Sequence, residues 1–142
     1  MSPLPYRIGI AALVGTAVYF CVGWLVFEAL LGDYMSENTT QLVGFKKTEE
    51  EASVLLLLVS CTAYAALLAI VFDRITSVRS FGKGMPWGAI IGVLVAVMTD
   101  SYWYASSHFF NSFVPLLADV AAAGITVGIM GGAIGWTLGK LQ

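Results

Sequence analysis

The chain has 142 residues, of which 58% are hydrophobic and only 11% are charged, and its mean hydropathy is +0.84. Soluble domains carry about 25% charged residues, so this composition cannot cover a water-facing surface. The formal net charge is −2 and no basic patch is present, which excludes a nucleic-acid-binding protein. The composition is typical of an integral membrane protein.

Four apolar runs follow one another along the chain, each about as long as a helix must be to cross the ~30 Å hydrocarbon core. Backbone polar groups in lipid must be satisfied within the segment, so we expect these runs to be helices. They cover residues 8–31, 52–72, 86–109 and 113–138. A cleaved signal peptide is a competing interpretation of the first run, but that run is longer than a signal-peptide core and no small-residue cleavage site closes it. We therefore predict a single all-α transmembrane domain, residues 1–142.

The connection between the first two predicted helices, residues 32–51, reads GDYMSENTTQLVGFKKTEEE. Thr48 is followed by three acids, and Glu51 stands at the spacing of a capping box. Acids in a first turn also face the positive end of the helix dipole. We interpret these acids as the start of the second helix and not as a binding site.

The basic residues lie mostly on one side of the predicted spans, and this bias sets the orientation of multi-pass proteins. Arg7, Arg74, Arg79, Lys83 and Lys140 lie on one side, and Lys46 and Lys47 lie on the other. The distribution predicts an integral membrane protein with an antiparallel four-helix transmembrane bundle, built from two helical hairpins. Both termini are expected in the cytoplasm, and residues 32–51 are expected outside.

The last predicted helix carries a row of glycines in alternating steps of four and three, which places them on one helix face. The row comprises Gly124, Gly128, Gly131, Gly135 and Gly139, and the preceding helix contributes Gly88 and Gly92. Small residues let helix backbones approach closely in lipid, where packing replaces the hydrophobic effect. We expect this glycine stripe to pack on the first or the third helix. The alternatives are a homo-oligomer seam, a docking surface for a membrane-protein partner, and a glycine-lined pore.

Asp100 stands inside the third apolar run, where a charge costs several kcal/mol and normally faces the bundle interior or water. The hairpin of the third and fourth helices brings Asp100 and Asp119 to similar depths, and Glu28 lies near the same end. Tyr104 and His108 follow Asp100 by four and eight residues, so they share its predicted helix face. These five residues predict an inward polar pocket that opens outward.

Most of these side chains also have a structural interpretation. Asp119 lies in the first turns of its helix, where the dipole favours an acid. Glu28 can extend its carboxylate to the interface, and His108 can belong to an interfacial aromatic belt. Asp100 is the exception, because none of the four runs contains a Lys or Arg that could neutralise it. It must be protonated, hydrogen-bonded or bound to a cation.

The sequence offers little material for catalysis or for a tightly bound cofactor. It has one histidine and two cysteines, whereas zinc sites use several such ligands. No phosphate-binding, dinucleotide or hydrolase motif occurs. We expect no enzymatic activity and no cofactor, and the sequence does not decide whether a metal binds. Cation or proton handling, as a transporter or channel component, is the favoured function. A non-catalytic accessory or assembly subunit of a larger membrane complex is the alternative.

Two segments, GWLVFEALLGDYM (residues 23–35) and VPLLADV (residues 114–120), combine with the Asp of the third helix in a recognisable pattern. The pattern resembles small four-helix bacterial inner-membrane proteins of unknown function, over most of the chain. The resemblance implies the four-helix membrane fold and a multi-pass location in the bacterial inner membrane. It implies no activity and no functional residue.

The distribution of basic residues predicts which loop faces outward. In a background with Cys21 and Cys61 replaced by alanine, Thr40→Cys should react with a membrane-impermeant thiol reagent in intact cells. Ser80→Cys should react only after lysis, which also serves as its control for reactivity. Labelling is read as a mass shift on a gel, and the reverse pattern would overturn the orientation.

Overall fold

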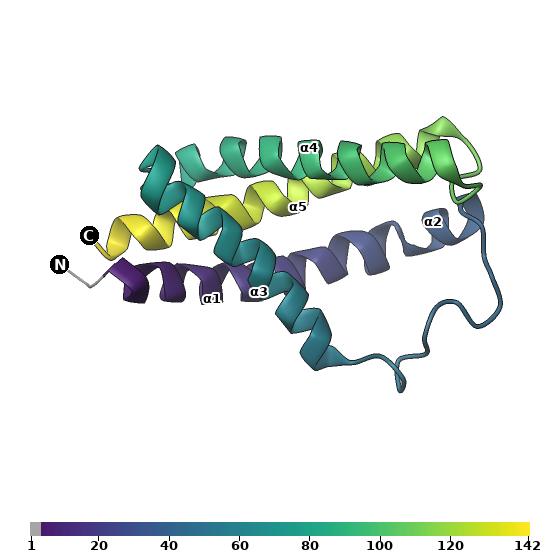
Figure 1. Cartoon of the computed structure of the whole chain (residues 1–142), viewed down its shortest axis with the longest axis horizontal. Helices are drawn as coiled ribbons and strands as arrows, with labels where there is room; N and C mark the ends of the chain where they lie inside the picture. Colours follow the sequence, from purple (N-terminus) through teal and green to yellow (C-terminus); the bar gives the residue numbers. More distant parts are fainter. Residues whose placement is uncertain (1–3) are drawn as a thin grey trace.

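The computed structural model describes residues 4–142, which are almost entirely helical (Figure 1). The elements in chain order are α1 (Leu4–Gly23), the π-helical η1 (Trp24–Leu30), α2 (Gly32–Asn38), α3 (Val54–Val71), the π-helical η2 (Phe72–Thr76), α4 (Phe81–Ser106) and α5 (Phe113–Lys140). Within these described residues there is no strand, only an isolated bridge between Thr39 and Phe110.

Four helical stretches are long and apolar enough to cross a membrane, which confirms the prediction of four membrane-length helices. They are Pro5–Leu30, Val54–Thr76, Phe81–Ser106 and Phe113–Lys140, with mean hydropathies between 1.5 and 2.6 in their most apolar windows. The chain is therefore a multi-pass membrane protein. The α5 window is 44% buried, against 17% to 22% in the other three, so α5 lies at the centre of the packing.

The helices α4 and α5 run side by side in opposite directions along their length (Figure 1). A Cβ placed on Gly88 would lie 2.5 Å from the carbonyl oxygen of Val127, and one on Gly131 would lie 2.6 Å from that of Gly84. Real carbon atoms do not approach backbone oxygens so closely. The two backbones therefore touch through glycine hydrogens, and a larger residue at either position must move a helix.

The glycine stripe of α5 faces α4 and the segment just before it. Gly128 approaches Ala89 of α4, and Gly135 approaches the carbonyl oxygen of Ser80. Of the two helices that the sequence left open as its partner, α4 is the one that covers the stripe. Because α4 fills this surface within one chain, the stripe is not free to form a seam with another copy or with a partner protein.

The helices α1 and α3 complete the packing around α5. The buried apolar core comprises Ala11, Ala12, Ala65, Leu68, Ala69, Phe72, Val78, Val127, Met130, Ile134 and Leu138. The second half of α3 contributes to this core, whereas residues 54–60 of its first half are all exposed. In Figure 1 this first half diverges from α1 and η1, so it packs on little of the chain.

The helix α4 begins five residues before the predicted start at residue 86. The hydroxyl group of Ser80 accepts a hydrogen bond from the backbone N–H of Lys83 at 3.3 Å, which caps the new start. Pro86 consequently lies inside α4 and not in its first turn. The added turn packs against α5 through Gly84, so tertiary contact extends this helix beyond its apolar run.

The connection predicted for residues 32–51 is shorter than expected, because α2 continues the helical path to Asn38. The predicted capping box does form, since the N–H of Thr48 bonds to Glu51 Oε2 at 3.1 Å. It closes an isolated turn, however, and does not start the helix. The start of α3 is at Val54, where the hydroxyl of Ser53 provides a second cap.

A buried ion-pair network joins three segments at the end of the molecule where α1 begins and α5 ends. The side chain of Asp73, only 1% exposed, contacts Arg7 Nη2 at 2.5 Å and Arg79 Nη2 at 2.7 Å. Arg79 also donates hydrogen bonds to the carbonyl oxygens of Phe72 and Val78, at 3.1 and 3.0 Å. The network fixes η2 to the start of α1 and to the segment before α4.

Substitutions in α4 test the helix contact. Gly88→Ala should lower the free energy of unfolding by about 1–3 kcal/mol, the usual cost of overpacking a tight interface. Gly82 lies in the same helix with no atom within 4 Å of an added Cβ, so Gly82→Ala should change stability by less than about 1 kcal/mol. Thermal unfolding in detergent measures both. Equal stabilities for the two variants would contradict the close approach.

The ion-pair network predicts a large effect at one position and a small one beside it. Asp73→Asn leaves two buried guanidinium groups without a counter-charge and should destabilise the protein by about 3–5 kcal/mol. Arg74 is exposed and in none of the ion pairs among the described residues, so Arg74→Gln should stay within about 0.5 kcal/mol of wild type. Thermal unfolding in detergent measures the stability of both variants. Equal stabilities would show that the network contributes little.

Candidate functional site

Asp100 is the last member of a row of buried residues along α4. Gly84, Gly88, Gly92 and Ala96 precede it at intervals of four, and all five are buried. Residues at this spacing share a helix face, and in α4 that face is turned toward α5. The row therefore carries the carboxyl group of Asp100 into the seam between α4 and α5, where the residue is only 7% exposed.

Asp119, in the second turn of α5, faces Asp100 across this seam. Their carboxyl groups are close enough to interact directly, and Asp100 Oδ2 has no hydrogen-bond partner among the described residues. None of the ion pairs formed by residues 4–142 includes either acid. Two carboxylates in a low-dielectric seam repel each other and lose hydration. Neutralisation of at least one of the two acids would relieve this repulsion.

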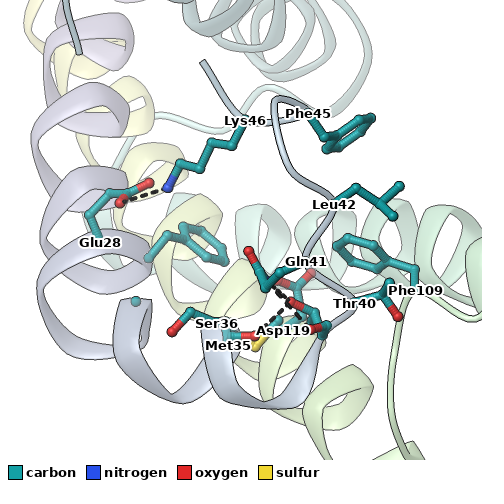
Figure 2. A pocket seen from close by; sticks show the side chains of 13 residues that line it. Glu28, Met35, Ser36, Thr40, Gln41, Leu42, Phe45, Lys46, Phe109 and Asp119 are labelled. Carbon is teal, nitrogen blue, oxygen red and sulfur yellow. Dashed lines mark hydrogen bonds and ion pairs between the residues drawn. The ribbon is translucent and has the colours of Figure 1, made fainter. Parts of the chain in front are cut away.

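Asp119 also lines a cavity of about 330 Å³ (Figure 2). Its other polar lining residues are Glu28, Ser36, Thr39, Thr40, Gln41 and Lys46. Figure 2 shows Asp119, Gln41 and Ser36 together on one side of the cavity, with the ion pair of Glu28 and Lys46 on the other. Asp100 does not line this cavity. Asp119 is therefore the link between the cavity and the buried carboxyl group.

The wall of this cavity is held in place by hydrogen bonds between segments far apart in the sequence. The N–H of Thr40 donates to the carbonyl oxygen of Phe109 at 2.7 Å, and the N–H of Asn111 donates to that of Asn38 at 2.9 Å. These bonds fasten the chain that follows α2 to the turn between α4 and α5. The polar groups of residues 36–41 are thereby brought over the start of α5.

Glu28 shares the cavity with Asp119 but does not join the acidic pair. Its carboxylate lies 3.6 Å from Lys46 Nζ, and the two side chains are 54% and 79% exposed. An exposed pair of this kind contributes little to stability. Glu28 is therefore an exposed carboxylate with a lysine partner, unlike Asp100.

Tyr104 and His108 do not lie with the acidic pair. The helix α4 ends at Ser106, because the side chain of Ser107 bonds to the carbonyl oxygen of Trp103 at 2.7 Å and to the N–H of Phe109 at 3.3 Å. His108 is thus an exposed loop residue, and the shared helix face expected from an uninterrupted helix to residue 109 does not extend to it.

Both residues instead line a separate surface hollow of about 420 Å³, to which neither acid contributes. The ring of Tyr104 packs edge-on against Phe113, with 5.7 Å between ring centroids. The five residues expected in one pocket therefore fall into two places. Asp100, Asp119 and, more distantly, Glu28 belong to the first, and Tyr104 and His108 belong to the second.

Several polar groups of the cavity were not anticipated from the sequence. Ser36, Thr39 and Gln41 belong to a segment that reads as an exposed loop, and no periodicity in it signals a role. Tyr19 of α1 does not line the cavity, and its ring packs edge-on against that of Tyr64, with 5.5 Å between ring centroids. The cavity thus draws on parts of the chain whose meeting depends on tertiary structure alone.

Comparisons add no functional assignment to this geometry. No protein family, no curated protein sequence and no solved structure matches the chain. Within residues 4–142, no group of three or more His, Cys, Asp or Glu side chains is arranged to hold a metal ion. What the site can do must therefore be argued from the acidic pair and its cavity.

Proposed function

We propose that this protein is a small transporter or channel component that handles a proton or a cation at the pair formed by Asp100 and Asp119. One observation carries the proposal. An acid that is only 7% exposed, with an oxygen lacking a partner, faces a second acid that lines a cavity. A structural carboxylate at this depth would be expected to have a basic partner.

The proposed orientation places this cavity in the outer leaflet. The five-to-two split of basic residues supports an antiparallel four-helix bundle with both termini in the cytoplasm. In Figure 1 the start of α1 and the end of α5 lie at the same end of the molecule, which is compatible with that topology. The bacterial inner membrane is the location that the resemblance suggests. A homo-oligomer would need a surface other than the glycine stripe.

The charge state of the pair is proposed to couple to the spacing of α4 and α5. A proton or cation that reaches Asp119 through the cavity neutralises the repulsion with Asp100, and the helices stay in close contact. When it leaves, two carboxylates repel each other in a seam where the backbones of α4 and α5 are already in contact. The seam then has to open or admit water, which gives two arrangements that the bound ion selects between.

An accessory or assembly subunit is the second candidate. The observation that favours it is the first half of α3, where residues 54–60 are exposed on every side. A helix of another membrane protein could pack there. Native mass measurement in mild detergent, with identification of copurifying proteins, separates this candidate from a protein that acts alone.

The acidic pair predicts how stability depends on pH. Folding brings two acids together in a seam that excludes water, where two negative charges repel each other, so stability should be lower at high pH than at low pH. Asp100→Asn mimics the protonated form and should fold normally while losing this dependence. If a cation binds at the pair, added Na⁺ or K⁺ should return the stability of the wild-type protein at high pH to its value at low pH. Thermal unfolding across pH measures these effects.

The control is Asp33→Asn, an exposed acid in the first turn of α2, which should keep the wild-type pH profile. Proteoliposomes that contain an internal pH dye test the function itself, since proton or cation flux should be lost in Asp100→Asn and retained in Asp33→Asn. Unchanged pH dependence and unchanged flux in Asp100→Asn would refute the proposal.

A further inference from the structure

Another cavity, of about 580 Å³, lies between η1 and the start of α3 and is distinct from the one that Asp119 lines. Its apolar wall is formed by Trp24, Leu56 and Leu57, whose residues are 62%, 66% and 50% exposed. Here α3 diverges from η1 in Figure 1. The cavity, called the α3 cleft below, therefore has apolar side chains that remain uncovered by the rest of the chain.

The mouth of the α3 cleft carries charges of both signs. Lys46 and Lys47 line it, and they are the only basic residues between Arg7 and Arg74. Glu28 and Glu49 line it as well, so two positive and two negative groups meet there. Lys46 Nζ lies 3.6 Å from Glu28 Oε2, and both side chains are mostly exposed. Both groups are therefore able to exchange partners.

The apolar wall and the charged mouth together fit an amphipathic molecule. The apolar wall belongs to the membrane-length stretches Pro5–Leu30 and Val54–Thr76, at the ends that carry the loop. A ligand there would expose an apolar part to the lipid side and a charged part to the loop. Balanced charge at the mouth favours a group with one anion and one cation over a purely anionic one.

We propose that the α3 cleft binds a glycerophospholipid whose headgroup carries both a phosphate and a primary ammonium group. The phosphate lies at Lys46 and Lys47, as lysine ammonium groups commonly bind phosphate. The ammonium lies at Glu49, whose carboxylate accepts its N–H hydrogen bonds. An acyl chain follows Trp24 and Leu56 toward the membrane interior.

A primary ammonium is required because a quaternary one has no N–H to donate. The proposal concerns a different cavity from the acidic pair and does not rest on the proposed function. The two cavities do share Glu28 and Lys46, which line both. A phosphate bound at Lys46 would compete with Glu28 for that lysine.

Fluorescence of Trp24 tests the proposal directly. A variant with Trp87, Trp103 and Trp136 replaced by phenylalanine keeps Trp24 as its only tryptophan. It is reconstituted in vesicles that contain a small fraction of lipid brominated on its acyl chains, which quenches a tryptophan in contact with it. Phosphatidylethanolamine should quench Trp24 about threefold more effectively than phosphatidylcholine or phosphatidylglycerol, as the loss of one exposed ion pair would predict.

The matched control keeps only Trp103, an exposed residue near the same end of the molecule but outside the cleft. All three brominated lipids should quench it equally. Lys46→Gln with Lys47→Gln, in the Trp24 background, should abolish the preference without unfolding the protein, because Lys46 is mostly exposed. Glu49→Gln should remove the advantage of phosphatidylethanolamine over phosphatidylglycerol.

Four outcomes would overturn the proposal. Equal quenching of Trp24 by all three lipids would show that the cleft holds no selective site, and a preference for phosphatidylglycerol or phosphatidylcholine would refute the headgroup. A preference that survives in the lysine double variant would refute the phosphate position. Full competition by soluble glycerophosphoethanolamine would show that the ligand is the headgroup alone, without a membrane anchor.

Discussion

The close approach of α4 and α5 is the constraint on which the rest of this structure depends. Glycines at Gly84, Gly88 and Gly131 let the two backbones touch, and that contact fixes the rotation of α4 about its axis. Every fourth residue of α4 must then face α5, including Asp100 at the end of the row. The burial of this carboxyl group is a consequence of helix packing. Exposing it to water would require α4 to rotate and to lose its contact with α5.

The two buried aspartates among the described residues have opposite surroundings. Asp73 contacts two arginines, Arg7 and Arg79, and has become a structural joint between segments. Asp100 faces another acid, keeps an unpartnered oxygen, and pairs with no described basic residue. Asp73 therefore has basic partners, whereas Asp100 has none among the described residues. This contrast favours a working role for the acidic pair over a purely structural one.

The spans were predictable because length and hydropathy decide helix formation in lipid, where the backbone has no other partner. The burial of Asp100 was predictable because a charge at membrane depth costs several kcal/mol and normally faces the bundle interior or water. The ion pairs of Asp73 were not, since Arg7 lies 66 residues away and reads as a topology signal. The position of His108 was missed because a single local cap at Ser107 ends α4 early.

Polar contacts restrain both ends of the molecule, whereas the first half of α3 makes few contacts. The Asp73 network holds one end, and the bonds between residues 38–40 and 109–111 hold the other. The first half of α3 belongs to neither. Helices adjust to a thicker or thinner bilayer mainly by tilting, and the least restrained helix tilts first. We therefore expect a change in bilayer thickness to act first on the exposed first half of α3, away from the seam that holds the two carboxyl groups.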